Sequence, residues 1–182
     1  VVEACDQDKP EYNDWVLRQG KEADLLCGYI ARADLKVTDF LIHHRRYQRT
    51  GFLNGYRFRF DELNDYLNDT LARQHLAILE RQGLVIDLLI EASHADDVVS
   101  LSRDFPRLKI VINHCFRAKI IDGDISDELK RAIKKCAAQK NVFCKMSSIN
   151  NFSEVAPFTD PAPTDLNYYL PVLDSVYDAF GE

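Results

Sequence analysis

Residues 107–114 read Arg107-Leu108-Lys109-Ile110-Val111-Ile112-Asn113-His114. A helical pattern ending at Phe105-Pro106 precedes them, and their apolar run predicts a buried strand over Lys109–His114. Of the five histidines, His114 alone ends such a strand. Barrel enzymes place catalytic side chains at the carboxyl ends of their strands, so this position favours a catalytic or ligand role for His114. The alternative is a structural histidine that is buried in the core with its hydrogen bonds made there.

Similar apolar runs alternate with helical patterns along the chain. Residues with helical spacing precede Gly83 and extend from Leu166 to Phe180, and Ser93-His94-Ala95-Asp96 resembles a helix capping box. Runs that are nearly continuous in Val, Ile, Leu, Phe and Tyr predict further strands buried on both faces, over Val1–Cys5, Leu26–Ala33, Phe52–Phe60, Leu84–Ile90 and Asn141–Met146.

Six strands alternating with helices predict βα units and a parallel sheet with right-handed crossovers. A doubly wound sheet and an arc of a (β/α)8 barrel both fit. A doubly wound nucleotide-binding fold usually shows a glycine-rich first turn, whereas this chain has seven glycines and neither GxGxxG nor a P-loop. We therefore expect an α/β fold of the (β/α)8 TIM-barrel type that is incomplete, with about six parallel βα units.

The length sets the expected extent of that barrel. A complete barrel takes about 250 residues, and 182 residues with 46% hydrophobic content suit one core. We expect a single domain over residues 1–182, corresponding to strands two to seven, with the first and last barrel strands missing. Such a chain alone is expected to be inactive and to expose two sheet edges that invite aggregation.

Composition limits the classes of partner and the cellular compartment expected for this chain. A net charge of −6 disfavours nucleic acid, and no apolar run reaches the roughly 18 residues needed to span a membrane. The basic cluster His43-His44-Arg45-Arg46 is expected to form a solvated helix face. Five cysteines without CxxC spacing indicate a reducing compartment, the cytoplasm by default, with three in apolar runs expected as small buried hydrophobes: Cys5, Cys27 and Cys144.

Several motifs, in order and at barrel spacing, carry a resemblance to a known family. They are Asn13-Asp14-Trp15-Val16 with Cys27–Leu35, Gly55-Tyr56-Arg57, Gly83–Leu89, the strand ending in His114, and Asn141-Val142-Phe143-Cys144-Lys145-Met146-Ser147. Together they resemble the amidohydrolase-related TIM-barrel family that includes sugar-acid lactonases and 2-pyrone-4,6-dicarboxylate lactonase. The resemblance implies that His114 is the active-site histidine of its strand.

The chain also departs from that family. The His-x-His of the family's first strand and the Gly-Ser-Asp-Trp of its last strand, whose Asp activates water, are absent from these residues. Phe116 and Ser148 stand where the family usually has glycine. The loops that follow His114 and Ser147 are therefore expected either to be shaped for another substrate or to have diverged after a loss of activity.

Hydrolysis of a lactone or amide needs a base, a group that polarises the carbonyl, and cations that hold an acidic substrate. His114 suits the polarising role or that of a metal ligand. Arg57 and Arg59 share one side of a strand and could clamp a carboxylate, or could be structural ion-pair partners. Lys145 and Ser147 share a side at the end of the next strand. Asp87 is expected to be a structural partner for a buried cation.

These residues lead to a hydrolase that opens a lactone or similar cyclic ester of a small carboxylic acid. His114 is the expected catalytic residue, and the expected substrate-binding residues are Arg57, Arg59, Lys145 and Ser147. The cofactor is left open between one divalent metal, such as zinc on His114, and none. The alternatives are a metal-dependent decarboxylase on the same barrel and an inactive fragment that serves as a binding or scaffold piece.

Overall fold

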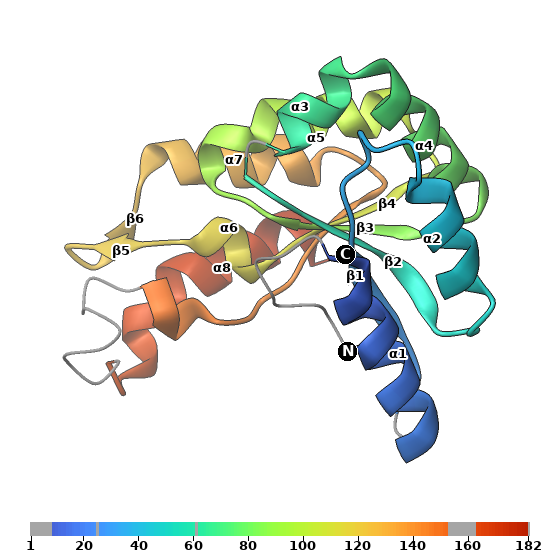
Figure 1. Ribbon diagram of the computed structural model, residues 1–182. Coiled ribbons are helices and arrows are strands. Elements are labelled where there is room, and N and C mark those ends of the chain that lie inside the picture. The colour runs from blue at the N-terminus through green and yellow to red at the C-terminus, as the bar shows by residue number, and fades with distance from the viewer. Residues whose placement is uncertain (1–8, 25, 61, 153–162, 182) are drawn as a thin grey trace. The chain divides into compact units, whose positions relative to one another are not determined.

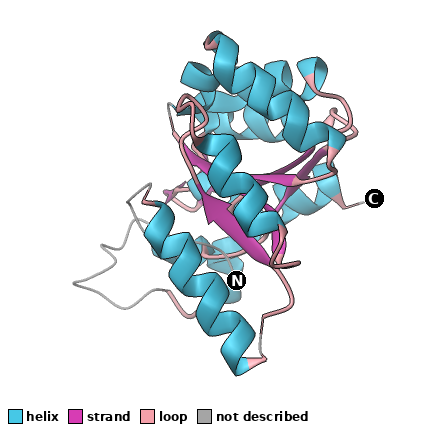
Figure 2. Ribbon diagram, turned by 45° about the vertical axis from the view of Figure 1, so that its right-hand side comes forward, coloured by secondary structure: helices cyan, strands magenta, loops and turns pink. Residues whose placement is uncertain are grey.

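The computed structural model describes residues 9–24, 26–60, 62–152 and 163–181. Helices and strands alternate along most of the chain (Figure 1), and Figure 2 distinguishes the two by colour. The chain divides into two compact units, Val1–Asp87 with Arg107–Lys109, and Leu88–Pro106 with Ile110–Glu182. The prediction of a single domain stays a prediction.

The first unit contains strands and helices in alternation. Its strands are β1 (Tyr29–Arg32), β2 (Leu53–Arg59) and the start of β3 (Val85–Leu89), and its helices are α1 (Pro10–Ala23), α2 (Phe40–Gln48), α3 (Glu62–Asn68) and α4 (Thr70–Arg81). Strands β1 and β2 run parallel, with Ala31 opposite Tyr56 and Arg32 opposite Arg57. Tyr56 and Phe58 of β2 are fully buried, which places the core of this unit on that strand.

Helix α4 shows why this sequence folds as it does. The carboxylate of Asp69 caps the helix by accepting a hydrogen bond of 2.8 Å from the amide of Ala72. Leu76 and Leu79 lie on the buried face with no exposed surface, and each contributes about 2 kcal/mol by burial. Gly83, at φ +68°, ends the segment as predicted.

The second unit continues the same alternation. Its elements are the end of β3, η1 (Ala92–His94), α5 (Ala95–Asp104), all of β4 (Lys109–Ile112) except its first residue, α6 (His114–Arg117), β5 (Ile120–Ile121), β6 (Asp124–Ile125), α7 (Asp127–Ala137), β7 (Val142–Cys144), η2 (Ile149–Phe152), η3 (Leu166–Tyr169) and α8 (Leu170–Phe180). Helix α7 packs against α5, α8 and β7. Strands β4 and β7 run parallel, with Ile110 opposite Val142 and Ile112 opposite Cys144.

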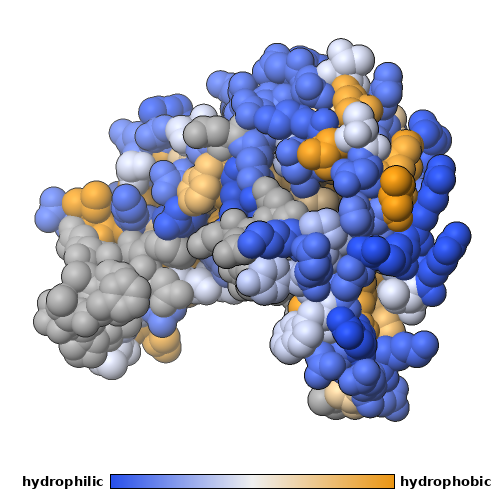
Figure 3. Space-filling view, viewed as in Figure 1, coloured by the Kyte–Doolittle hydropathy of each residue, from blue (hydrophilic) through white to orange (hydrophobic). Residues whose placement is uncertain are grey.

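Five strands form the main sheet, in the order β1-β2-β3-β4-β7. The predicted alternation of parallel strands and helices is thereby confirmed, each strand lying within the run expected for it. The sixth predicted strand, Val1–Cys5, lies outside the described residues. No helix in the described ranges combines the length and apolar character that crossing a bilayer requires. The face seen in Figure 3 is mostly hydrophilic, with small separate hydrophobic spots.

Three local predictions are wrong. His44 of the basic cluster is 1% exposed; its ring shares hydrogen bonds with the Tyr56 hydroxyl (2.8 Å) and the Gln82 side chain (2.7 Å), so it is a satisfied core residue. Cys27 is exposed rather than buried, because the regular strand begins two residues later. The capping box is made by Glu91 and His94 instead of starting at Ser93.

A short hairpin was not predicted. Strands β5 and β6 pair antiparallel, and Asp122 and Gly123 between them both have positive φ, +52° and +78°. This conformation is that of the two-residue hairpin turn for which Asp-Gly is a preferred sequence. The dipeptide was thus the signal that could have revealed it.

Candidate active site

The predicted site residues of the second unit meet just beyond the ends of β4 and β7. Nδ1 of His114 and the hydroxyl of Ser147 share a hydrogen bond of 2.9 Å. Because β4 and β7 are parallel neighbours, residues that follow each strand leave the sheet at the same edge. The strand pairing therefore brings together two residues that the sequence separates by 33 positions.

Lys145, the other predicted residue of this segment, is held by Asn113. Its ammonium donates a hydrogen bond of 3.0 Å to Oδ1 of Asn113. The amide Nδ2 of Asn113 donates in turn to the carbonyl of Leu88 at 3.1 Å. This second bond turns Oδ1 toward Lys145. Asn113 was not singled out from the sequence, although a polar residue directly before His114 at a strand end was the available signal.

The backbone carrying His114 is strained. His114, Cys115, Phe116 and Arg117 have φ values of +54°, +49°, +60° and +53°, so that α6 is a left-handed turn of four non-glycine residues. Each such residue costs about 1–2 kcal/mol relative to the right-handed form. Persistent strain of this kind is held by surrounding structure and concentrates at functional sites.

Burial and backbone hydrogen bonds hold this turn in place. Cys115 and Phe116 are buried at 0% and 2% exposure. The amide of Cys115 donates to the carbonyl of Lys145 at 3.2 Å, and the amide of Phe116 donates to the carbonyl of Asn113 at 3.2 Å. The turn that presents His114 is thus fixed to the segment that presents Lys145 and Ser147.

The two positions at which the resembled family usually has glycine both have left-handed backbone. Phe116 has φ +60° and Ser148 has φ +53°. Glycine adopts this conformation without steric cost. Glycine, which the resemblance implies at both positions, would suit the backbone found here, whereas this chain has side chains there.

Two thiols lie beside the same strands. A hydrogen bond with Cys144 lowers the pKa of the buried Cys115 thiol, while that hydrogen bond and burial raise the pKa of the Cys144 thiol. Cys27, Cys115, Cys136 and Cys144 are all free thiols. Burial raises the pKa of Cys136 to about 12, which makes it a poor nucleophile.

Arg57 lies in the first unit as one half of a buried ion pair. Its Nε donates to Oδ1 of Asp87 at 2.7 Å, and the side chains are 9% and 1% exposed. Asp87 is therefore a structural partner for a buried cation, as predicted. The use of Arg57 as a substrate clamp, and its placement at one barrel mouth with His114, stay predictions.

The carboxylate of Glu62, at the start of α3, accepts hydrogen bonds from Arg32 of β1 and Arg59 of β2. Arg32 of β1 binds its carboxylate with both terminal nitrogens and also donates to the carbonyl of Arg57 at 3.3 Å. The backbone amide of Arg59 donates to the same carboxylate at 2.9 Å. The buried charge of Arg32 is thereby compensated, and the end of β2 is tied to α3.

The described residues around His114 lack the set of ligands that zinc requires. Zinc in proteins is held by three or four His, Cys, Asp or Glu ligands. Within the described residues no three such side chains come together, and Ser147 and the Lys145 segment adjoin His114. The described donors therefore do not complete a zinc site.

A family model for amidohydrolases (Amidohydro_2) matches residues 3–182. The chain belongs to this amidohydrolase family. It is 26% identical over 169 residues to L-fucono-1,5-lactonase of Burkholderia ambifaria, a match covering 92% of this chain and 56% of the lactonase. It is 31% identical over 133 residues to the uncharacterized protein y4mH of Sinorhizobium fredii, covering 67% of this chain and 44% of that protein. The chain thus spans about half the length of these relatives.

Solved amidohydrolases share the fold. A crystal structure of an amidohydrolase from Burkholderia multivorans with bound HEPES superposes with a TM-score of 0.82 at 20% identity, covering 99% of this chain and 63% of that one. A second crystal form of it with bound zinc gives a TM-score of 0.80 at 19% identity, with the same coverage. These neighbours are of the TIM-barrel type, which confirms the predicted fold class.

Proposed function

We propose that this amidohydrolase opens a lactone or similar cyclic ester of a small carboxylic acid. The observation that carries the proposal is the pair His114 and Ser147, held 2.9 Å apart beyond two neighbouring parallel strands. The carboxyl ends of strands are where TIM-barrel enzymes do their chemistry. The similarity to an L-fucono-1,5-lactonase supports a lactone as the substrate class.

His114 is proposed to polarise the reacting carbonyl or to move a proton. A serine hydroxyl both donates and accepts, so Ser147 can stabilise either neutral tautomer of the ring. When Ser147 donates to Nδ1, Nε2 carries the proton and can donate to a carbonyl oxygen. When Ser147 accepts from Nδ1, the lone pair of Nε2 can take a proton.

Lys145 is proposed to stabilise negative charge. Hydrolysis of an ester places a negative charge first on the carbonyl oxygen and then on the product carboxylate. The hydrogen bond with Asn113 fixes the ammonium group in advance, so little reorganisation is required as the charge develops. Arg57 and Arg59 are proposed as further cations that attract a small acidic substrate.

The test is a hydrolysis assay on the full-length protein with a panel of sugar-acid 1,4- and 1,5-lactones. His114→Asn should lower kcat by at least about 100-fold, the lower range for a general acid–base group. The matched control is His43→Asn, since His43 is a partly exposed histidine of α2 that pairs with Asp39. Its kcat should equal that of the wild type.

Two results would contradict the proposal. One is a folded wild-type protein that hydrolyses none of the lactones above the uncatalysed rate. The other is a His114→Asn variant that keeps the wild-type kcat for whichever lactone is hydrolysed.

A further inference from the structure

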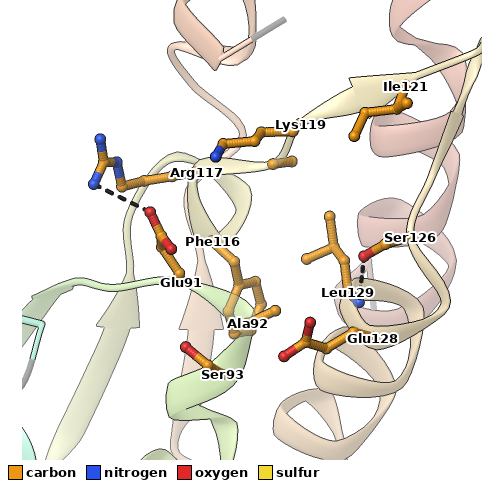
Figure 4. Close-up of a pocket in the computed structure, with 11 residues that line it drawn as sticks. Glu91, Ala92, Ser93, Phe116, Arg117, Lys119, Ile121, Ser126, Glu128 and Leu129 are labelled. Atoms are coloured by element: carbon orange, nitrogen blue, oxygen red, sulfur yellow. Dashed lines mark hydrogen bonds and ion pairs between the residues drawn. The ribbon is translucent and has the colours of Figure 1, made fainter. Parts of the chain in front are cut away.

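A pocket of about 330 Å³ lies in the second unit, next to the left-handed turn that begins at His114. Figure 4 shows its walls: the residues that follow β3, the turn and the hairpin that follow β4, and the start of α7. Residues that follow β3 and β4 thus line this pocket. Phe116 and Arg117 belong both to the pocket and to the strained turn.

One wall of the pocket carries two cations. Arg117 makes an ion pair with Glu91 at 3.4 Å, the dashed contact of Figure 4, and Glu91 also caps η1. Lys119 extends from the same side, is exposed, and makes no ion pair within the residues that the structure describes. Of these two cations, Lys119 is the one that a ligand can engage without breaking an existing pair.

The opposite side of the pocket suits hydroxyl groups. Ser93 and Glu128 project from η1 and α7 on this side in Figure 4, and both are exposed. The hydroxyl of Ser126 accepts a hydrogen bond of 3.2 Å from the amide of Leu129, which leaves its proton available for donation. Buried Phe116 and Leu129 supply apolar surface between the two sides.

We infer that this pocket binds an aldonate, the open-chain polyhydroxy carboxylate that hydrolysis of a sugar lactone releases. Its carboxylate would pair with Lys119, its hydroxyls would bond Ser93 and Glu128, and its C–H groups would contact Phe116. The chemical class rests on the proposed function, whereas the placement of the site rests on the lining residues alone.

The charges of the pocket favour this ligand over two others. A phosphate would carry about two negative charges toward Glu91 and Glu128 as well as toward the cations. A zwitterion without hydroxyls would satisfy Lys119 and Glu128 but would leave the serines facing carbon. A single carboxylate with several hydroxyls matches one accessible cation and a set of hydroxyl partners.

The experiment is calorimetric titration of the full-length protein with three probes. D-gluconate has the carboxylate and the hydroxyls, D-glucitol has only hydroxyls, and 6-aminohexanoate is a zwitterion without hydroxyls. We expect gluconate to bind most tightly. Lys119→Gln should weaken gluconate binding by about tenfold, as for loss of one bond to a charged group, and Lys119→Arg should restore most of it. Lys21→Gln, at an exposed lysine of α1 in the first unit, is the matched control and should leave the dissociation constant unchanged.

The inference is overturned if gluconate does not bind, if Lys119→Gln binds it as tightly as the wild type, or if 6-aminohexanoate binds more tightly. If these results accompany lactone hydrolysis that depends on His114, only the pocket assignment fails. If gluconate binds through Lys119 and no lactone is hydrolysed, the proposed function fails and the pocket assignment stands.

Discussion

Nδ1 of His114 lies 2.9 Å from Oγ of Ser147, and this contact fixes the ring of the histidine to the segment after β7. It lies beside a second contact between the same segments, from Lys145 to Asn113. The two hydrogen bonds set the orientation of both predicted chemical groups. Replacing Ser147 or Asn113 should therefore alter the orientation of His114 or Lys145, respectively.

Ser147→Ala should reduce kcat by about five-fold, because one hydrogen bond of about 1 kcal/mol no longer orients the imidazole. Ser147→Thr keeps the hydroxyl and serves as the control. An Ala variant with the wild-type kcat would show that the contact has no part in the reaction.

Asp87→Ala should lower the free energy of unfolding by about 3–5 kcal/mol, because it leaves the buried guanidinium of Arg57 without its carboxylate. The control is Asp65→Ala, which breaks the exposed pair between Lys36 and Asp65 and should cost less than about 1 kcal/mol. Urea denaturation measures both. Equal losses would mean that Asp87 is dispensable to the fold and that Arg57 is held by other contacts.

Ser148→Gly should stabilise the protein by about 0.5–1 kcal/mol. Glycine relieves a left-handed residue that costs about 1–2 kcal/mol, and part of this gain is offset by the greater freedom of glycine in the unfolded chain. Phe116→Gly relieves the same strain but removes a buried ring, so it should destabilise by about 2 kcal/mol or more. Thermal unfolding of the two variants tests the pair, and a destabilised Ser148→Gly protein would contradict the prediction.

Stability should fall as the pH decreases from 7 to 5, in part because of His44. Burial lowers the pKa of His44 below its ordinary value of 6.5. The unfolded chain therefore binds a proton in this window that the folded chain does not, so the stabilisation present above pH 6.5 is lost as the pH falls. His44→Gln should reduce this slope, as measured by urea denaturation at several pH values. A His44→Gln slope equal to that of the wild type would count against this assignment.

Much of the fold follows from local patterns in the sequence. The strand ending before His114 and the helix ending just before Gly83 could be located from the sequence, because continuous apolar runs and a positive-φ glycine act locally. Close packing explains the glycine of the Gly55-Tyr56-Arg57 motif. A Cβ at Gly55 would lie 2.0 Å from the carbonyl oxygen of Val85, so this position of β2 excludes every side chain.

The features that the sequence did not predict depend on contacts between residues that are distant in the sequence. Cys, Phe and Arg have no preference for left-handed backbone, and the turn at 114–117 persists because burial of Cys115 and Phe116 offsets the strain. Burial of His44 required Tyr56 and Gln82 as partners from other elements. The pairing of Lys145 with Asn113 follows from the register between β4 and β7, which periodicity does not specify.

The β5–β6 hairpin has an evolutionary consequence. It forms between residues only a few positions apart and places Ile121 at the rim of the pocket in Figure 4. Its Asp122-Gly123 tip is exposed, so residues inserted or exchanged there need not disturb the strands that carry His114 and Lys145. Divergent members of such a lineage could therefore acquire new ligand preferences by remodelling this hairpin while the chemistry at the strand ends is inherited unchanged.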